Sequence, residues 1–248
     1  AAVTKADLTV TAAGTRTYGE TNNNTKVDYT VTGLKNGDTQ AQAVTGLGGT
    51  LNYVSADGPV NHNGTSTKSK DIDEKTDAGT YTIGLGSVSG TSTNYNLIAN
   101  GTTGSTLTIN KADLTYTISG ENTYGSPEAS YSYTNVTGIK SVDQQADVLD
   151  SSKLSSVGAG LRTNAGLNGD THVVRDSDGN AAAAAIGSLT SEAAAFLVKS
   201  PNYNAAASFS YTIKPAELTY KVNDNTKTYG DTALTNANTG SFQTAAGT

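Results

Sequence analysis

The chain has 248 residues with a net charge of −6 and a sequence pI near 4.8, so its acidic surface argues against a nucleic-acid partner. It has neither cysteine nor methionine, which excludes disulfides, thiolate nucleophiles and thiolate metal sites. No run of about 20 apolar residues is present, so the sequence predicts no membrane-spanning segment.

A short motif near the start returns twice. Lys5-Ala6-Asp7-Leu8-Thr9 is matched from Lys111 and again from Pro215, at separations of 106 and 104 positions, and each copy is followed by Thr-Tyr-Gly. Such spacing predicts tandem repeats. The predicted ranges are the tail of a preceding repeat (1–4), a first repeat (5–110), a second repeat (111–214) and the truncated start of a third (215–248). The recurring marker residues are Tyr18, Gly19, Tyr124, Gly125, Tyr229, Gly230, Tyr95 and Tyr203.

In the first repeat, apolar residues alternate with polar ones, as in half-buried strands. The predicted strands are 6–11, 27–32, 47–54, 79–85, and 94–98 with 107–109 as a closing pair. Asn36-Gly37 predicts a turn, and the polar stretch 61–77 predicts a surface excursion. We therefore expect five or six strands and no strong helix.

The second repeat keeps this order but differs in its middle. Residues 143–154 predict a short helix, and 192–199 an insertion of one or two helical turns before Pro201. The alanine run 181–185 has a helix-forming composition, but alignment with Tyr81-Thr82-Ile83 predicts a strand at 183–186. The third repeat is too short to predict an independently stable sheet.

Few residues have the pattern of a chemical site. His62 and His172 lie in polar stretches of different repeats and lack the surroundings of a Ser-His-Asp triad. The acidic runs 71–74 and 176–178 are typical of solvated loops. The candidate Ca²⁺ ligands are Asp176, Asp178 and Asn180, although the same residues also suit a plain turn. We expect no enzyme activity and no required cofactor.

The recurring tyrosines admit two interpretations. Exposed tyrosines could stack on sugar rings or contact a protein partner. A packing tyrosine whose hydroxyl finds a buried partner, next to a glycine in a tight turn, accounts for the recurrence better. We therefore predict that the Lys-Ala-Asp-Leu-Thr…Tyr-Gly stretch forms the entry strand and first turn of each module, and that it fixes how each repeat docks on the preceding one.

The ordered motifs resemble the MBG/YDG-type repeats of large bacterial surface adhesins. They are Lys5–Thr9, Thr17–Gly19, Val31–Asp38, Gly79–Ile83, Asn94–Asn96 and Leu107–Ile109. The second repeat departs from the pattern, with Ser141-Val142-Asp143 in place of Asn-Gly-Asp and Ala182–Ala184 in place of Gly-Thr-Tyr. The resemblance implies mainly β modules, β-grasp-like or Ig-like sandwiches, arranged end to end as an elongated rod.

The resemblance also implies a function. We expect non-catalytic stalk or spacer repeats of an extracellular adhesin at the bacterial surface, often of the filamentous-haemagglutinin-like kind, which project a binding region and support attachment or biofilm. The expected partners are neighbouring repeats of the same polypeptide. Two alternatives remain open: the repeats themselves bind glycans or matrix, or they self-associate into filaments by strand exchange.

Overall fold

The protein is mainly β: of the residues that the structure describes, 50% lie in strands and 14% in helices, and the sheets are curled. The computed structural model describes residues 2–66, 68–123, 126, 130–165, 183–214, 217–222, 227–230 and 240–244. The chain divides into two compact units. The first unit comprises Ala1–Thr115, Val136–Asp150 and Ser191–Ala206, and the second comprises Tyr116–Asn135, Ser151–Thr190 and Ala207–Thr248.

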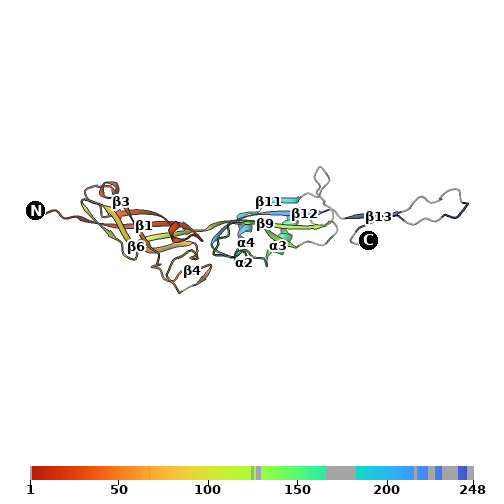
Figure 1. Cartoon of the computed structure of the whole chain (residues 1–248), viewed down its shortest axis with the longest axis horizontal. Helices are drawn as coiled ribbons and strands as arrows, with labels where there is room; N and C mark the ends of the chain where they lie inside the picture. The colour runs from red at the N-terminus through yellow and green to blue at the C-terminus, as the bar shows by residue number, and fades with distance from the viewer. Residues whose placement is uncertain are drawn as a thin grey trace. The chain divides into compact units, whose positions relative to one another are not determined.

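The first unit is built on one curled sheet of six strands, seen in Figure 1. Its strand order is β2 (Lys26–Thr32), β1 (Ala6–Thr17), β8 (Ser105–Asn110), β6 (Gly79–Thr91) and β3 (Thr45–Asn52), with β7 (Tyr95–Ala99) pairing β1 off this path. The prediction of five or six strands is close, because this part of the chain adds only the two-residue strands β4 (Asn61–His62) and β5 (Thr65–Ser66). Its helical elements are the short turns η1 (Asn22–Asn24) and α1 (Gln40–Ala43).

Strand β1 is twice as long as predicted and organises the sheet. On one side it pairs antiparallel with β2. On the other it pairs parallel with β7 over Ala6–Val10 and parallel with β8 over Ala13–Thr17. The prediction that 94–98 and 107–109 form a pair is therefore wrong, since both segments pair with β1 instead. Each is too short to cover β1 alone, and together they satisfy the backbone groups along most of its length.

The alternation of β1 sets the core of the first unit. Leu8, Val10 and Ala12 are buried, while the residues between them are only partly covered. Leu8 packs in a cluster with Ala43, Val44 and Tyr95. The predicted turn after β2 is present: Asp38 donates its backbone N–H to the Lys35 carbonyl at 2.9 Å, and Asn36 and Gly37 both have positive φ.

The polar stretch 61–77 is more ordered than a surface excursion. β4 and β5 form an antiparallel hairpin, and isolated bridges join Val54 to Asp71 and His62 to Thr76. Ile72, Thr76 and Asp77 are buried. The prediction of a surface segment is therefore wrong for the second half of this stretch, whose Asp73 carbonyl accepts a hydrogen bond from Arg16 near the end of β1.

The second repeat supplies a four-stranded sheet. Its order is β10 (Tyr131–Thr137), β9 (Ala112–Thr123), β12 (Tyr203–Lys214) and β11 (Ala183–Ser188). The strand predicted at 183–186 from the alignment is confirmed, as is the helical insertion, which is α4 (Ser191–Phe196). The helix predicted at 143–154 is only α2 (Gln145–Val148), and α3 (Leu154–Asn164) begins where that prediction ended.

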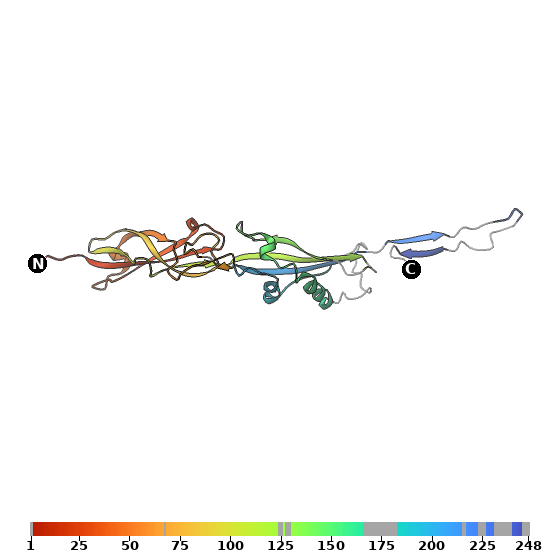
Figure 2. The same cartoon turned by 90° about the horizontal axis from the view of Figure 1, so that it is seen from below.

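In the third repeat, β13 (Leu218–Val222) and β14 (Gly240–Thr244) pair antiparallel as a two-stranded sheet (Figure 2). Leu218, Tyr220 and Val222 are about half exposed. Among the residues that the structure describes, no helix has the length and apolar character needed to cross a membrane.

A glycine follows the second strand of both repeats, at a position where a side chain would be strained. Gly33 and Gly138 have φ values of 101° and 93°. A Cβ at Gly138 would lie 2.0 Å from the carbonyl oxygen of Asp113, and one at Gly33 would lie 2.8 Å from that of Asp7. We expect Gly138→Ala to lower the free energy of unfolding by at least about 2–3 kcal/mol, because strain adds to a clash with rigid backbone. Urea denaturation measures this, with Gly37→Ala, which has open space around its Cβ, as the control for positive φ alone.

Candidate functional site

The most developed polar site joins residues of the first and second repeats inside the first compact unit. We call it the tyrosine–aspartate junction. It comprises Tyr18, Asn63 and Asp77 from the first repeat and Asp143, Asn202 and Tyr203 from the second.

Tyr18 reaches the junction because β1 ends in a tight turn. Its backbone N–H donates to the carbonyl of Asn110, the last residue of β8, at 2.8 Å. Gly19 follows with a φ of 79°. A Cβ on Gly19 would lie 2.5 Å from Cβ of Lys140, so this glycine lets the turn lie directly against the second repeat.

The Asp143 carboxylate holds two tyrosines. It accepts hydrogen bonds from the Tyr18 hydroxyl at 2.9 Å and from the Tyr203 hydroxyl at 2.7 Å. Tyr203 in turn accepts the backbone N–H of Lys140 at 3.0 Å. The two rings meet edge to face with centroids 5.7 Å apart, a favourable aromatic geometry.

The Tyr18 hydroxyl also lies 2.6 Å from Oδ1 of Asn63. Its single proton serves only one acceptor at a time, so Asn63 and Asp143 share it. Asn63 also donates from Nδ2 to the Val142 carbonyl at 3.4 Å. Both repeats therefore contribute acceptors around one tyrosine.

Asn202 forms a second bridge beside the first. Its side-chain Nδ2 donates to Asp77 at 2.8 Å, and its Oδ1 accepts the backbone N–H of Ala78 at 2.8 Å. The side chain is fully buried. A buried amide with both ends satisfied fixes the position of its neighbours, because an unpaired end would cost free energy.

The surroundings keep both tyrosines protonated above the pH at which a free tyrosine ionises. Burial, together with the hydrogen bond to Asp143, raises the pKa of the Tyr18 hydroxyl far above its ordinary value of 10. Burial likewise raises the pKa of Tyr203. A protonated phenol beside a carboxylate is a good hydrogen-bond donor and a poor general base. The junction is thus suited to holding the two repeats together through hydrogen bonds.

The first repeat contains the second half of the same arrangement at its other end. Tyr95 donates to Asp38 at 2.6 Å and accepts the backbone N–H of Lys35 at 3.0 Å. Asp38 and Asp143 are 105 positions apart, as are Lys35 and Lys140, and Tyr95 and Tyr203 are 108 apart. The turn is also preserved: Asp143 donates its backbone N–H to Lys140 at 3.0 Å, although Ser141 and Val142 lack positive φ.

The remaining marker residues and candidate ligands predicted from the sequence lie either in the third repeat or outside the described residues. Tyr229 is fully exposed, and Gly230 has a φ of 101°. Tyr124, Gly125, His172 and the candidate Ca²⁺ ligands Asp176, Asp178 and Asn180 lie outside the described residues. The described ranges contain no group of three or more acidic or histidine side chains that could hold a metal ion.

His62 and the nearby acidic run have structural surroundings. His62 Nε2 lies 3.1 Å from the Asp73 carboxylate, with about a fifth of the histidine side chain exposed. Asp73 also accepts the backbone N–H of Lys75 at 2.9 Å and thereby closes a turn. The expectation that the chain is not an enzyme stays a prediction.

The acceptor residues Asp38, Asp143 and Asn202 were not among the expected site residues. Their signal was available in the sequence, because Asp38 and Asn94 belong to the repeated motifs Val31–Asp38 and Asn94–Asn96. What the sequence lacked was any indication that these motifs meet the Thr-Tyr-Gly turn of a neighbouring repeat.

Comparison with known proteins adds no relative. No family model, no curated protein and no solved structure matches this chain.

Proposed function

We propose that this chain is a non-catalytic spacer, a set of stalk repeats in an extracellular bacterial adhesin that projects a binding region from the cell surface. In this proposal the modules are β-grasp-like or sandwich-like and are arranged end to end. Its basis is the resemblance of the ordered motifs to MBG/YDG-type repeats, together with the tyrosine–aspartate junction.

The observation that carries the proposal is the use of positions that recur between the repeats for docking. Tyr18 of the first repeat and Tyr203 of the second bind the same carboxylate, Asp143. A binding module would present its recurring aromatic residues on an exposed surface that contacts the ligand. A spacer uses them to join one repeat to the next, because the stiffness of these junctions determines how far the binding region is projected.

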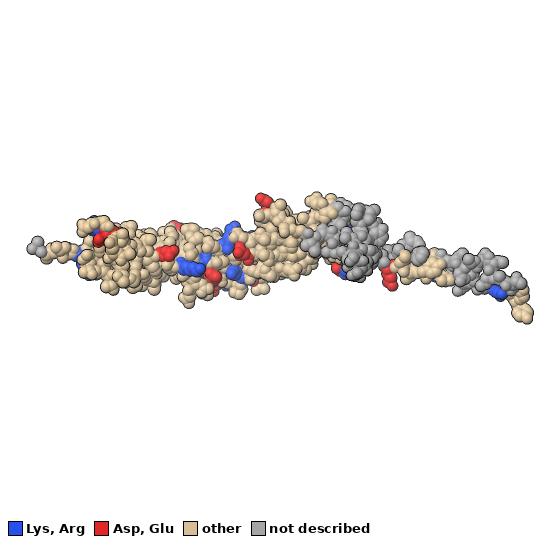
Figure 3. Space-filling view, turned by 90° about the horizontal axis from the view of Figure 1, so that it is seen from above, with Lys and Arg blue, Asp and Glu red and all other residues tan. Residues whose placement is uncertain are grey.

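The surface supports spacing over ligand binding. Every tyrosine of the first repeat is described, and all of them, Tyr18, Tyr29, Tyr53, Tyr81 and Tyr95, are buried or half-buried. Sugar stacking requires an accessible aromatic face. On the face drawn in Figure 3 the charged side chains are sparse and of mixed sign, without the basic patch that would attract a polyanion.

Two measurements on the intact chain test the spacer. Applied to arrays of glycans and matrix proteins at micromolar concentration, the chain is expected to bind none of them. In single-molecule pulling, Asp143→Ala is expected to lower the unfolding force, and Asp38→Ala to lower it less, because Asp38 holds one tyrosine and not two. Saturable binding of any arrayed ligand would contradict the spacer proposal and favour the alternative that the repeats themselves bind glycans or matrix.

A further inference from the structure

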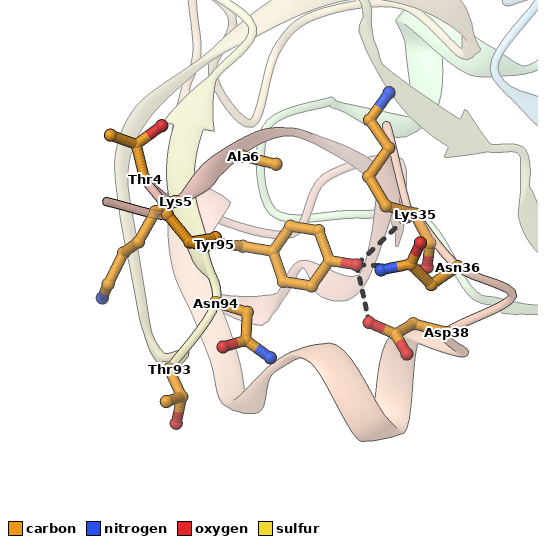
Figure 4. Close-up of a pocket in the computed structure, with 10 residues that line it drawn as sticks. Thr4, Lys5, Ala6, Lys35, Asn36, Asp38, Thr93, Asn94 and Tyr95 are labelled. Carbon is orange, nitrogen blue, oxygen red and sulfur yellow. Dashed lines mark hydrogen bonds between the residues drawn. The ribbon is translucent and has the colours of Figure 1, made fainter. Parts of the chain in front are cut away.

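The N-terminal end of the first repeat has a pocket whose lining includes residues equivalent to the acceptor half of the tyrosine–aspartate junction. The pocket has a volume of 340 Å³, and its lining includes Thr4, Lys35, Asn36, Asp38, Asn94 and Tyr95. Figure 4 shows the Tyr95 hydroxyl directed across it toward Lys35 and Asp38. We call this feature the open acceptor pocket.

Each wall of the open acceptor pocket has a counterpart at the occupied junction. Asp38 corresponds to Asp143 and Tyr95 to Tyr203, and these pairs form hydrogen bonds of 2.6 and 2.7 Å. Lys35 corresponds to Lys140, whose side chain lies against Gly19. At the occupied junction the remaining space holds the Tyr18-Gly19 turn of the preceding repeat.

Two equivalent asparagines differ in burial between the occupied junction and the open acceptor pocket. Asn202 is fully buried because it bridges to Asp77 and Ala78 of the first repeat. Asn94, which precedes Tyr95 as Asn202 precedes Tyr203, is exposed. The same contrast holds for the carboxylates, since Asp143 receives two tyrosine hydroxyls while Tyr95 is the tyrosine bound to Asp38.

The position directly before Lys5 corresponds to the residue that holds the turn at the occupied junction. At the occupied junction the Asn110 carbonyl accepts the backbone N–H of Tyr18 at 2.8 Å. Thr4 lines the open acceptor pocket and stands directly before Lys5, as Asn110 stands before Lys111. Tyr18 and Asn110 both belong to the first repeat, so an added repeat joined directly before Lys5 would hold its own turn with its own final carbonyl, in the position of Thr4.

We propose that the open acceptor pocket receives the Thr-Tyr-Gly turn of another repeat of this type, joined directly before Lys5 in the same polypeptide. The hydroxyl of the incoming tyrosine donates to Asp38, which then accepts from two tyrosines as Asp143 does. The incoming glycine lies against the Lys35 side chain, and Asn94 becomes buried between the two repeats as Asn202 is. Direct linkage favours this occupant over a separate chain, because a short connection gives a millimolar effective concentration. The inference rests on the spacer proposal and extends it by naming the residues that each repeat presents to the next.

The test places a single fluorotyrosine at position 95 of the full chain and follows its ¹⁹F resonance. A copy of residues 5–110 is then joined directly before Lys5, in place of residues 1–4. With the added repeat, the Tyr95 resonance is expected to move to a new position in slow exchange. Tyr18→Phe in the added repeat is expected to lower the ratio of docked to undocked molecules about tenfold, since it removes one hydrogen bond to a carboxylate.

Matched controls make the result specific. Lys26→Gln in the added repeat changes an exposed strand residue and is expected to leave the shifted Tyr95 resonance unchanged. Fluorotyrosine at position 203 of the original chain, with and without Tyr18→Phe, records the change that loss of docking causes at the known junction. A fluorotyrosine at position 53 of the added repeat reports whether that repeat is folded.

An unmoved Tyr95 resonance beside a folded added repeat overturns the inference. A shift that grows with concentration in the unextended chain also overturns it, because the occupant is then a second copy. Neither outcome touches the spacer proposal, which depends on the junction between the first and second repeats. Conversely, binding on the glycan arrays would defeat the spacer proposal without changing the ¹⁹F result.

Discussion

Replacing Asp143 with alanine is expected to lower the free energy of unfolding by about 2–4 kcal/mol, because two buried tyrosine hydroxyls lose a charged acceptor. Tyr18 and Tyr203 both donate to this carboxylate, at 2.9 and 2.7 Å. The stability of Asp143→Asn is expected to lie between that of the unmodified chain and that of Asp143→Ala. Its single amide oxygen still accepts from one tyrosine, but the charge is lost. Urea denaturation followed by circular dichroism measures all three proteins.

The matched control is Asp38→Ala. Asp38 occupies the equivalent turn and accepts from Tyr95, so the loss expected there is clearly smaller than at Asp143. The difference between the two variants isolates the contribution of Tyr18. Equal losses at the two positions would show that docking of Tyr18 adds nothing to the stability of the chain.

Stability is expected to fall steeply as the pH rises above 10. Burial raises the pKa of Tyr116 to about 12, and burial also raises the pKa values of Tyr18 and Tyr203. In the unfolded chain these tyrosines ionise near pH 10, so above that pH the unfolded state has released protons that the folded state still holds. Each such tyrosine therefore contributes stability below pH 10 and loses at most about 1.4 kcal/mol per pH unit above it, until the folded pKa is reached.

Urea denaturation between pH 8 and 11 tests this dependence. Tyr18→Phe is expected to be less stable at pH 8, because a hydrogen bond is lost, but to lose stability more slowly above pH 10. Its curve therefore converges on that of the unmodified chain. Ile118→Val removes packing at a buried position without removing a titrating group, and is expected to lower stability about equally at every pH. Parallel curves for Tyr18→Phe and the unmodified chain would contradict the assigned role of Tyr18.

Much of the first repeat was predictable because its first two strands alternate in burial. The alternation of Leu8 and Val10 with threonines locates a strand and its buried face, and Asn36-Gly37 locates the turn that follows the second strand. The length of β1 was not predictable in this way. After Ala12 the inward positions are filled by Gly14 and Arg16, and neither residue marks a buried strand. Arg16 is nevertheless buried, with its guanidinium bound to carbonyl groups of Glu20 and Asp73.

The helix α3 escaped prediction for a related reason. Its segment Leu154–Asn164 contains Gly158 and Gly160, which disfavour helices. The structure explains Gly158, because a Cβ there would lie 2.4 Å from the Tyr131 ring. Close packing against an aromatic ring thus selects a residue that helix propensity opposes. A preference that depends on a tertiary neighbour leaves no periodic signal in the local sequence.

The tyrosine–aspartate junction was predictable only in half. Recurrence of Thr-Tyr-Gly predicted a turn that docks on the preceding repeat, whereas the structure places Tyr18 in contact with Asp143 and Tyr203 of the following repeat. The partner of Tyr18 could not be identified from the sequence. Asp143 lies 125 positions from Tyr18, and many other polar residues at comparable separations are equally plausible acceptors. The alignment of Lys140–Asp143 with Lys35–Asp38 nevertheless preserves the turn despite replacement of Asn-Gly, because one backbone hydrogen bond defines it in both copies.

The parallel pairing of β1 with β8 has a mechanical consequence. Tension applied through the chain pulls Ala6 at the beginning of β1 and Asn110 at the end of β8 in opposite directions. Because the two strands are parallel over Ala13–Thr17 and Thr106–Asn110, this load runs along the strands and strains their hydrogen bonds together in shear. An antiparallel pair loaded at adjacent ends would instead open one bond at a time. The first repeat therefore has the strand arrangement that resists extension, independently of which residues occupy its core.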